Sequence, residues 1–390
     1  MSAPLGNPAE VITVSGTGFH YPIEFDNSSS LPELYPALAA RILSLAPSAG
    51  VFALLSDDNT SLLFAPSLAS ALSALLPSSR RVIQHVFSAG ESSKSRAAKA
   101  HCEDTLLAHR CGRDTVIIAL GGGVIGDLAG FIAATYMRGV PCIQIPTTLL
   151  AMVDSAIGGK TAIDTAKGKN LIGAFHHPLA VLLSPLFLTT LPLRELSNGM
   201  AEVIKTGLIA APALFALCEA SAAQVLTQRE PLTLRRILHD TARVKAAVVS
   251  ADPQERWVRA VLNAGHTLGH GLEALATPDL LHGEAVSVGL VLELEIAART
   301  GALTDVALVE RAKRVLRAYK LPVETPAHLT TGHVIAAMGV DKKNVGGNVR
   351  SVLLRALGDV ALESKGSDSD PTADASTSDC NACGNCEQCP

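Results

Sequence analysis

Three histidines and one glutamate provide the clearest chemical signal in the sequence. His266 and His270 lie four residues apart, which places both imidazoles on one face of a helix. His282 follows twelve residues after His270, and Glu202 lies upstream, one helical turn before Lys205. Three histidines and a carboxylate on helices suit a catalytic zinc ion that keeps one coordination position open. A lone histidine is more often a packed or surface residue, so the helical spacing is what favours a metal site.

Lysines and arginines form a second group that could do chemistry. Several lie among glycines and small residues, as in Ile157–Thr161 and Lys167–Asn170, which is unlike a solvated stripe of charge. Because only 17% of the residues are charged, these cations indicate a pocket for an anionic, phosphorylated substrate. Surface lysines spread over several helices are the alternative. The group comprises Arg138, Lys160, Lys169, Lys205, Lys245, Arg259, Lys342 and Lys343.

A glycine-rich turn predicts a nucleotide site. The apolar run Thr115–Leu120 leads into the segment Gly121–Asp127, which is typical of a strand, a tight turn and a helix. Glycines let backbone N–H groups approach a phosphate, and the helix N-terminus adds a positive dipole end. The spacing G-x-G-x-x-G is present, although this pattern is weak by itself. The acid that usually follows is missing, whereas Asp57 follows an earlier strand, so we expect a departure from the common Rossmann order.

Strands alternate with helices in the first half of the chain, which indicates a parallel sheet flanked by helices. Ligands bind such sheets beyond the carboxyl ends of the strands, where Glu91, Gly122 and Thr147 fall. Asp57 and Asn59 also follow a strand, and they could bind a ribose or form a simple turn. The expected elements are a hairpin of Val11–Val14 and His20–Phe25, helices Leu34–Ser44 and Ser67–Leu76, and strands Val51–Ser56, Val82–Phe87, Thr115–Leu120 and Pro141–Ile145.

From about Arg194 the pattern becomes helical, with a late extended segment near Val349–Leu354. The helical segments are 194–208, 212–227, 231–250, 255–276, 283–300 and 303–319. We therefore predict an α/β protein with a Rossmann-like, parallel-sheet nucleotide-binding domain over 1–190. A mainly α-helical domain that binds metal and substrate follows over 191–362, and 363–390 form a disordered, acidic, cysteine-rich tail.

The tail carries four cysteines at a strict spacing of three residues: Cys380, Cys383, Cys386 and Cys389. They could bind zinc, copper(I) or part of an iron–sulfur cluster. One short loop rarely closes a tetrahedral site unaided, so we favour a tail that binds no physiological metal.

Composition narrows the class of protein further. A net charge of −4 argues against a nucleic-acid binder. No apolar run has the length of a membrane span, and the first residues lack the features of a signal or transit peptide. The other four cysteines are scattered, so we expect a reduced, cytoplasmic chain whose partner is a small molecule.

Together these residues resemble dehydroquinate synthase, and most closely the version that begins the fungal pentafunctional arom polypeptide. The resemblance runs from about Val51 to Leu362, and chance agreement over this length is implausible. It implies a two-domain enzyme that works as a homodimer, with NAD and zinc, or another divalent metal such as cobalt, bound between the domains. The most specific blocks are Gly121–Arg138, Pro146–Ala174, Asn198–Thr206, Leu262–Glu273 and Asp341–Asn344.

Carried over residue by residue, the resemblance implies four sets of site residues. The zinc ligands fall on Glu202, His266 and His282. The NAD contacts fall on Asp57, Asn59, Glu91, Lys94, Gly122, Gly123, Val124, Asp127, Thr147, Thr148, Lys169, Phe187, Thr190 and Asn198. The substrate contacts fall on Arg138, Asp154, Lys160, Asn170, Glu202, Lys205, Lys245, Arg259, Asn263, His266, His282 and either Lys342 or Lys343. The catalytic set is Glu255, His270, Lys160, Asp154 and Lys205, of which Glu255 and His270 match proton-transfer positions.

The implied activity is that of a 3-dehydroquinate synthase, a phosphate-eliminating carbon–oxygen lyase of the shikimate pathway to chorismate and the aromatic amino acids. It converts 3-deoxy-D-arabino-heptulosonate 7-phosphate into 3-dehydroquinate through transient oxidation by NAD, β-elimination of phosphate, re-reduction and an intramolecular aldol reaction. The alternatives are a cyclase of sedoheptulose 7-phosphate, a metal-dependent polyol dehydrogenase and a catalytically silent module. Retention of the whole charged pocket argues against silence, and whether the chain works alone or within a longer polypeptide stays open.

Overall fold

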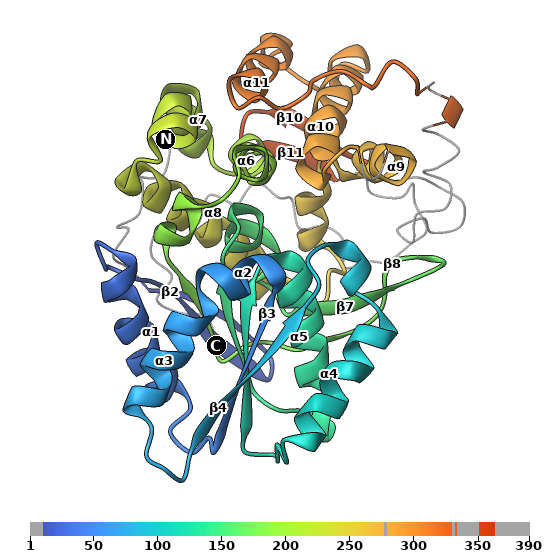
Figure 1. Cartoon of the computed structure of the whole chain (residues 1–390). Helices are drawn as coiled ribbons and strands as arrows, with labels where there is room; N and C mark the ends of the chain where they lie inside the picture. Colours follow the sequence, from blue (N-terminus) through green and yellow to red (C-terminus); the bar gives the residue numbers. More distant parts are fainter. Residues whose placement is uncertain (1–10, 277–278, 330–331, 334–350, 363–390) are drawn as a thin grey trace, which may run out of the picture.

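Seven strands form a single sheet in the lower layer of Figure 1, in the order β1-β2-β9-β6-β5-β3-β4. The strands are β1 (Ile12–Gly16), β2 (Phe19–Phe25), β3 (Val51–Asp57), β4 (Arg81–Phe87), β5 (Thr115–Gly121), β6 (Cys142–Pro146) and β9 (Ala180–Leu183). β1 and β2 form an antiparallel hairpin at one edge, and the other neighbouring strands run parallel. This computed structural model describes residues 11–276, 279–329, 332–333 and 351–362. Within them, the predicted parallel sheet and its opening hairpin are confirmed.

Both faces of the sheet are buried, which explains why its central strands read as continuous apolar runs. Phe52 and Leu54 of β3 pack in a different cluster from Ala53 and Leu55, as the alternation of side chains along a strand requires. Helices α1 (Leu31–Leu45) and α3 (Ala65–Leu75) cover one face, and α4 (Arg96–Ala108) and α5 (Gly123–Thr135) cover the other.

The chain reverses its direction of travel across the sheet between β3 and β5. β3 is followed by β4 on one side, whereas β5 is followed by β6 on the other. A crevice opens beyond the carboxyl ends of the strands at such a switch point, and ligands of α/β proteins bind there. Asp57 ends β3 and Gly121 ends β5, so both flank this point.

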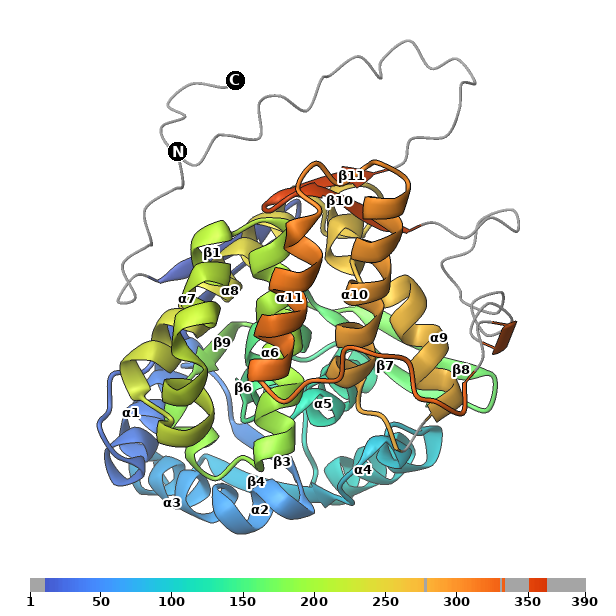
Figure 2. The same ribbon diagram turned by 90° about the horizontal axis from the view of Figure 1, so that it is seen from above.

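The upper layer of Figure 1 is helical. It contains α6 (Leu193–Ile209), α7 (Pro212–Ala223), α8 (Pro231–Ala251), α9 (His266–Ala276), α10 (His282–Arg299), α11 (Ala307–Ala318) and the hairpin of β10 (Val352–Ala356) with β11 (Asp359–Leu362). Seen from above, α6 lies among α7, α8, α10 and α11 (Figure 2). Every residue of α6 from Leu196 onward is buried.

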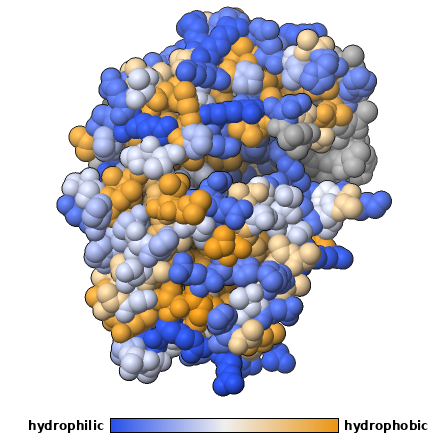
Figure 3. Space-filling view, viewed as in Figure 1, coloured by the Kyte–Doolittle hydropathy of each residue, from blue (hydrophilic) through white to orange (hydrophobic). Residues whose placement is uncertain are grey.

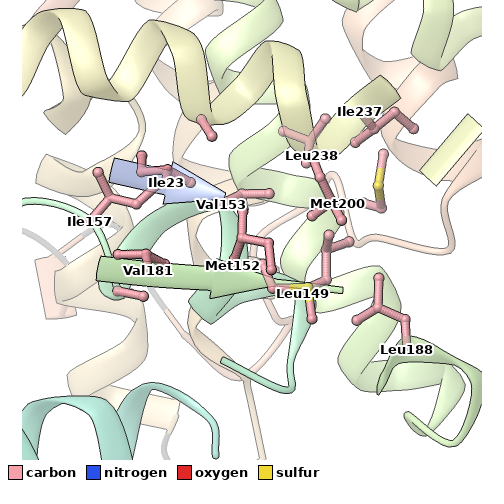
Figure 4. Packing of buried hydrophobic residues seen from close by; sticks show 14 of the residues in the cluster. Ile23, Leu149, Met152, Val153, Ile157, Val181, Leu188, Met200, Ile237 and Leu238 are labelled. Atoms are coloured by element: carbon pink, nitrogen blue, oxygen red, sulfur yellow. The ribbon is translucent and has the colours of Figure 1, made fainter. Parts of the chain in front are cut away.

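One hydrophobic core joins the two layers. Figure 4 shows Met152 and Val153, from the segment that follows β6, packed between the sheet and the helices α6 and α8. Met200 of α6 and Leu238 of α8 belong to the same cluster as Ile23 of β2. Because interiors are close-packed, side chains on α6 and α8 are held at fixed positions relative to the strand ends.

Two local elements were not predicted from the sequence. The segment Asp58–Leu63 is the short helix α2, and Asp57 caps it: the Asp57 Oδ1 accepts hydrogen bonds from both the amide and the hydroxyl of Thr60, each 2.9 Å long. This N-terminal cap makes the segment a helix, in place of the simple turn considered from the sequence. The sequence also missed the antiparallel hairpin of β7 (Lys160–Thr165) and β8 (Gly168–Phe175), because many residues of β8 face solvent.

The predicted helix over 255–276 starts eleven residues later than expected, at His266. Before it, the chain forms a loop and the 3₁₀ turn η6 (Val258–Asn263). The Asp252 carboxylate accepts the backbone N–H groups of Arg256, Trp257 and Arg259, and Glu255 has a φ of 57°. Backbone groups held in this way cannot enter a regular helix.

Several expectations lie outside what the structure tests. The Asp341–Asn344 block, with Lys342 and Lys343, and the cysteine tail fall outside the described residues. The domain boundary between residues 190 and 191 stays a prediction. No helix of the described part of the chain is long and apolar enough to cross a bilayer. On the face shown in Figure 3, hydrophobic residues form small patches among hydrophilic ones.

Two leucines on neighbouring helices give a matched test of this packing. Leu68 of α3 is fully buried, whereas Leu62 of α2 is 83% exposed. We expect Leu68→Ala to lower the free energy of unfolding by about 2–5 kcal/mol, since it leaves a cavity. Leu62→Ala should change it by less than about 0.5 kcal/mol. Denaturant titration of both variants measures the difference, and equal losses would contradict the described core.

Candidate functional site

Three side chains from three helices converge at the boundary of the helical layer. Glu202 comes from α6, His266 from the first residue of α9 and His282 from the first residue of α10. The Glu202 Oε1 lies 3.4 Å from the His266 Nε2 and 3.6 Å from the His282 Nε2. Their ligand atoms all lie within 4.8 Å of one another, so this trio could hold a metal ion.

The geometry of the trio fits a divalent metal. Two ligands bound at about 2.1 Å in tetrahedral geometry lie about 3.4 Å apart, close to the spacing of these atoms. The Glu202 Oε1 is buried and has no hydrogen-bond partner within the described residues. A buried carboxylate oxygen without a partner is costly, and a cation between the three atoms would satisfy it.

The two imidazoles are oriented by bonds from their other ring nitrogen. The Nδ1 of His266 lies 3.2 Å from the Ala264 carbonyl oxygen, and the Nδ1 of His282 lies 3.0 Å from the Oε2 of Glu273. Nδ1–H donation to these oxygens leaves each Nε2 as the atom that can bind a metal.

The charged groups of the trio are buried and stabilise one another in place of water. Burial opposes the charged form of His282, yet the neighbouring Glu202 and Glu273 carboxylates raise its pKa to about 10. Burial also opposes ionisation of Glu202, but Lys205 and His282 lower its pKa to about 2. Glu202 therefore carries a buried negative charge that attracts a cation. When no metal is bound, a proton on His282 supplies the positive charge.

Four lysines of the predicted anion pocket form ion pairs with carboxylates. The pairs are Lys205 with Glu202, Lys160 with Glu255, Lys245 with Asp154, and Lys169 with Glu273. Lys205 and Lys245 are buried, so the alternative of surface lysines is wrong for them. Glu255 also accepts a hydrogen bond of 3.2 Å from the Asn263 amide, which brings three predicted substrate or catalytic residues together.

Arg259 is held by the loop that follows α8. The residue is 2% exposed, and its guanidinium donates to the Pro253 carbonyl at 2.7 Å and to the Gly158 carbonyl at 3.4 Å. Gly158 has a φ of 111°, and its amide donates to the Tyr21 hydroxyl at 2.9 Å. A Cβ at Gly158 would collide with the guanidinium, so only glycine allows this close approach.

The predicted nucleotide residues line the carboxyl ends of four adjacent strands. Gly122 is the N-cap of α5, and the Thr147 amide donates to the Gly121 carbonyl at 2.9 Å. A Cβ on Gly122 would lie 3.1 Å from Thr148, and one on Gly123 would lie 2.9 Å from the Ser155 hydroxyl. The glycine turn therefore packs closely against its neighbours at the N-terminus of α5, a position where backbone N–H groups can bind an anion.

A buried lysine lies beside this turn. The Lys94 ammonium is 2.8 Å from Asp127 and 3.6 Å from Glu91, and it donates to the Asn170 side-chain oxygen. These carboxylates raise the pKa of Lys94, although burial acts in the opposite direction. Four predicted cofactor or substrate residues from three separate segments thus meet at the Lys94 ammonium.

The remaining predicted residues are more dispersed. The ring of His270 lies 5.2 Å from that of His266, so His270 lies next to the trio, as the helical spacing indicated. Asn198 donates to Glu195 and accepts from the Gly283 amide at 2.6 Å, which ties α6 to the start of α10. The other placements are Asn59 in α2, Val124 in α5, Arg138 at the exposed end of the turn η2 (Tyr136–Arg138), Phe187 in the turn η4 (Pro185–Thr189), and Thr190 directly after it.

Sequence reasoning missed two residues that organise the site. Asp252 holds the loop that carries Glu255 and Arg259, and its only sequence signal is a turn-forming Asp-Pro pair. Glu273 bonds to His282, and it lies three residues after His270 on α9. That helical spacing was visible in the sequence and could have identified Glu273.

Comparison with known proteins adds sequence and structural matches. Residues 84–198 match the model of the 3-dehydroquinate synthase N-terminal domain, and residues 199–344 match the model of its C-terminal domain. A structure of 2-epi-5-epi-valiolone synthase from Streptomyces hygroscopicus subsp. jinggangensis 5008, with NAD⁺ and Zn²⁺ bound, is 30% identical. The match covers 88% of this chain and 92% of that one, with a TM-score of 0.78.

Two further structures share the fold. One is 2-deoxy-scyllo-inosose synthase complexed with carbaglucose-6-phosphate, NAD⁺ and Co²⁺, at 24% identity, 91% and 94% coverage of the two chains and a TM-score of 0.80. The other is glycerol dehydrogenase from Schizosaccharomyces pombe, at 20% identity, 78% and 80% coverage and a TM-score of 0.56. The family models and the valiolone synthase agree, and the chain belongs to the dehydroquinate synthase family.

Proposed function

We propose that this protein is a 3-dehydroquinate synthase that converts 3-deoxy-D-arabino-heptulosonate 7-phosphate into 3-dehydroquinate and phosphate. The observation that carries the proposal is the charge state around Arg259. Each described lysine of the pocket has a carboxylate partner. In the parts of the chain that the structure describes, Arg259 is buried and donates to backbone carbonyls, with no carboxylate at ion-pair distance.

A buried guanidinium without a counter-ion is suited to a substrate carboxylate. An isolated buried charge is unfavourable, and an arginine offers paired donors that match a carboxylate. Lys245 and Arg259 interact electrostatically, and both interact with Asp154. The heptulosonate carries a carboxylate at C1, whereas sedoheptulose 7-phosphate has a neutral hydroxymethyl group there. We assign Lys245, Arg259 and Asn263 to that end of the substrate.

The other cations serve the phosphate end. Lys160 and Lys205, with Lys342 or Lys343, hold the phosphate that is eliminated, because ammonium groups stabilise both the bound and the departing anion, and the neutral amide of Asn170 adds a hydrogen-bond donor. Glu255 and His270 transfer protons. Glu255 contacts Lys160 and Asn263, so it lies between the two groups that we assign to opposite ends of the substrate.

The site residues also fit the two cofactors of the valiolone synthase structure. Glu202, His266 and His282 would hold a divalent metal, and the strand-end residues from Asp57 to Thr148, with Lys169, Phe187, Thr190 and Asn198, would hold NAD. When bound, NAD supplies reversible oxidation of a substrate hydroxyl, and the metal polarises that oxygen. Helix α6, which carries Glu202, packs against the segment that follows β6, and this contact supports a single site to which the chain presents both groups.

One rival has support of its own. The 30% identical structure is a 2-epi-5-epi-valiolone synthase, which keeps a cyclase of sedoheptulose 7-phosphate as the second candidate. Such an enzyme would place a neutral group against Arg259 and leave that charge uncompensated. A buried group left unsatisfied costs about 1–3 kcal/mol, so the geometry favours the acidic substrate.

The metal assignment predicts the behaviour of a histidine variant. His282→Ala removes one of three ligands, and we expect it to lose most bound metal and activity while remaining folded. His109→Ala, at the exposed end of α4, is the control and should keep both. Elemental analysis of the purified proteins measures the metal per chain. Undiminished metal in His282→Ala would overturn the assignment.

Substrate choice predicts the behaviour of Arg259 variants. The unmodified protein should release phosphate from the heptulosonate phosphate without added reductant, and far faster than from sedoheptulose 7-phosphate. Arg259→Ala should lose about 5- to 150-fold in kcat/KM for the acidic substrate, the equivalent of about 1–3 kcal/mol. Arg259→Lys should lose less, because it keeps the charge without the paired donors. Comparable turnover of both substrates by the unmodified protein would favour the rival cyclase.

Lys245 predicts a pH dependence. Burial lowers its pKa to about 8, although Asp154 favours the charged form. Lys245 is charged below that pH and becomes neutral above it, so its attraction for a substrate carboxylate declines as pH rises. We expect kcat/KM for the heptulosonate phosphate to fall by up to tenfold per pH unit above about pH 8. Lys245→Met should show low activity without this alkaline limb; the same limb in the variant would assign it to another group.

A further inference from the structure

A single carboxylate links the metal-capable trio to the β7–β8 hairpin. Glu273 lies on α9, and its Oε2 is 3.0 Å from the Nδ1 of His282. Its Oε1 accepts a hydrogen bond of 2.7 Å from the Lys169 ammonium, on β8. Glu273 is mostly buried, and its two oxygens are used by side chains from different layers of the fold.

The first of these bonds acts on the metal site. The Nε2 of the same imidazole faces Glu202 at 3.6 Å, so Nδ1–H donation to Glu273 fixes both the tautomer and the ring orientation. A carboxylate behind a histidine ligand also raises the basicity of the ligand nitrogen. Glu273 therefore acts on the metal through His282 without touching it.

The second bond reaches the cofactor side. Lys169 precedes Asn170, which bonds to the Lys94 ammonium at the nucleotide turn. The Lys169 side chain is 44% exposed, so its ammonium can turn from Glu273 to a bound anion. The chain of contacts runs from the hairpin through Glu273 and His282 to Glu202.

We propose that Glu273 is a positioning residue that couples the metal site to the cofactor site. The proposal rests on the proposed function, in which Lys169 contacts NAD. When NAD engages the Lys169 ammonium, Glu273 loses a competing partner and its full charge acts on His282. The metal then binds more tightly in the presence of NAD, and NAD binds more tightly in the presence of the metal by the same factor.

A different role for Glu273 must be distinguished. Ligand atoms of His270, Glu273 and His282 also lie within 4.8 Å of one another, so Glu273 could bind a metal directly. The first trio is favoured because the unpartnered Glu202 Oε1 belongs to it, whereas both oxygens of Glu273 already have partners. The two roles predict opposite results for His270→Ala.

The experiment measures the Co²⁺ affinity of the metal-stripped full-length chain against a chromophoric chelator, with and without saturating NAD. Glu273→Gln keeps the shape and removes the charge, and we expect about 10- to 100-fold weaker Co²⁺ binding with altered visible absorption of the bound ion. NAD should tighten Co²⁺ binding in the unmodified chain but not in Glu273→Gln. Lys169→Met should keep tight Co²⁺ binding and lose the effect of NAD.

The controls separate positioning from a structural role. Glu310→Gln makes the same change on the exposed face of α11 and should alter neither affinity nor spectrum. Without metal, Glu273→Gln should keep the far-UV circular dichroism and the cooperative unfolding of the unmodified chain. Co²⁺ affinity within twofold of the unmodified chain in Glu273→Gln would overturn the positioning role, and so would loss of Co²⁺ in His270→Ala.

Separate results would overturn the coupling between metal binding and NAD binding. Equal Co²⁺ affinity with and without NAD in the unmodified chain would overturn it, as would an unchanged NAD effect in Lys169→Met. All readouts are binding measurements that need no sugar phosphate. Failure of the protein to cyclise the heptulosonate would therefore refute the proposed activity while leaving these results interpretable.

Discussion

The site depends on one buried charge, the Glu202 carboxylate, which is 2% exposed in the middle of α6. Taking a carboxylate out of water is expensive unless cations and donors surround it. Lys205, one turn along the same helix, supplies one cation, and the imidazoles of His266 and His282 approach from two other helices. Glycines in α6 allow the close packing that holds this arrangement. A Cβ at Gly199 would meet the backbone after β6, and one at Gly207 would meet the backbone of α7.

The surrounding pocket also pairs its buried lysines with carboxylates. These lysines and carboxylates are already in place before any substrate binds. Dipoles and charges fixed by the fold need no reorganisation during a reaction, which is the main source of electrostatic catalysis. Arg259 differs from the lysines because backbone carbonyls, and no described carboxylate, receive its donors. Asp252 keeps it in place by holding the loop backbone rather than the guanidinium. Carboxylates therefore neutralise the buried lysines of the pocket, whereas the buried Arg259 is held by backbone carbonyls.

The sequence was sufficient for features that depend on local pattern. The apolar runs of β3 and β5 predicted buried parallel strands, and the spacing of His266 and His270 placed both rings on one side of α9. Features that depend on distant partners were not predictable in this way. The break before α9 comes from the Asp252 carboxylate, which captures amides that a helix would otherwise use. The bond from Asn198 to the Gly283 amide joins residues 85 positions apart, and no local pattern marks it.

Three ion pairs of the pocket connect the two layers. Lys160 of β7 pairs with Glu255 after α8, Lys169 of β8 pairs with Glu273 of α9, and Lys245 of α8 pairs with Asp154 after β6. In each pair, one partner precedes residue 190 and the other follows it. An anionic substrate that engages these cations competes with internal carboxylates, so binding exchanges contacts between the layers for contacts through the ligand. A ligand with anions at both ends can replace more than one of these ion pairs, so its charge distribution determines which contacts between the layers are exchanged.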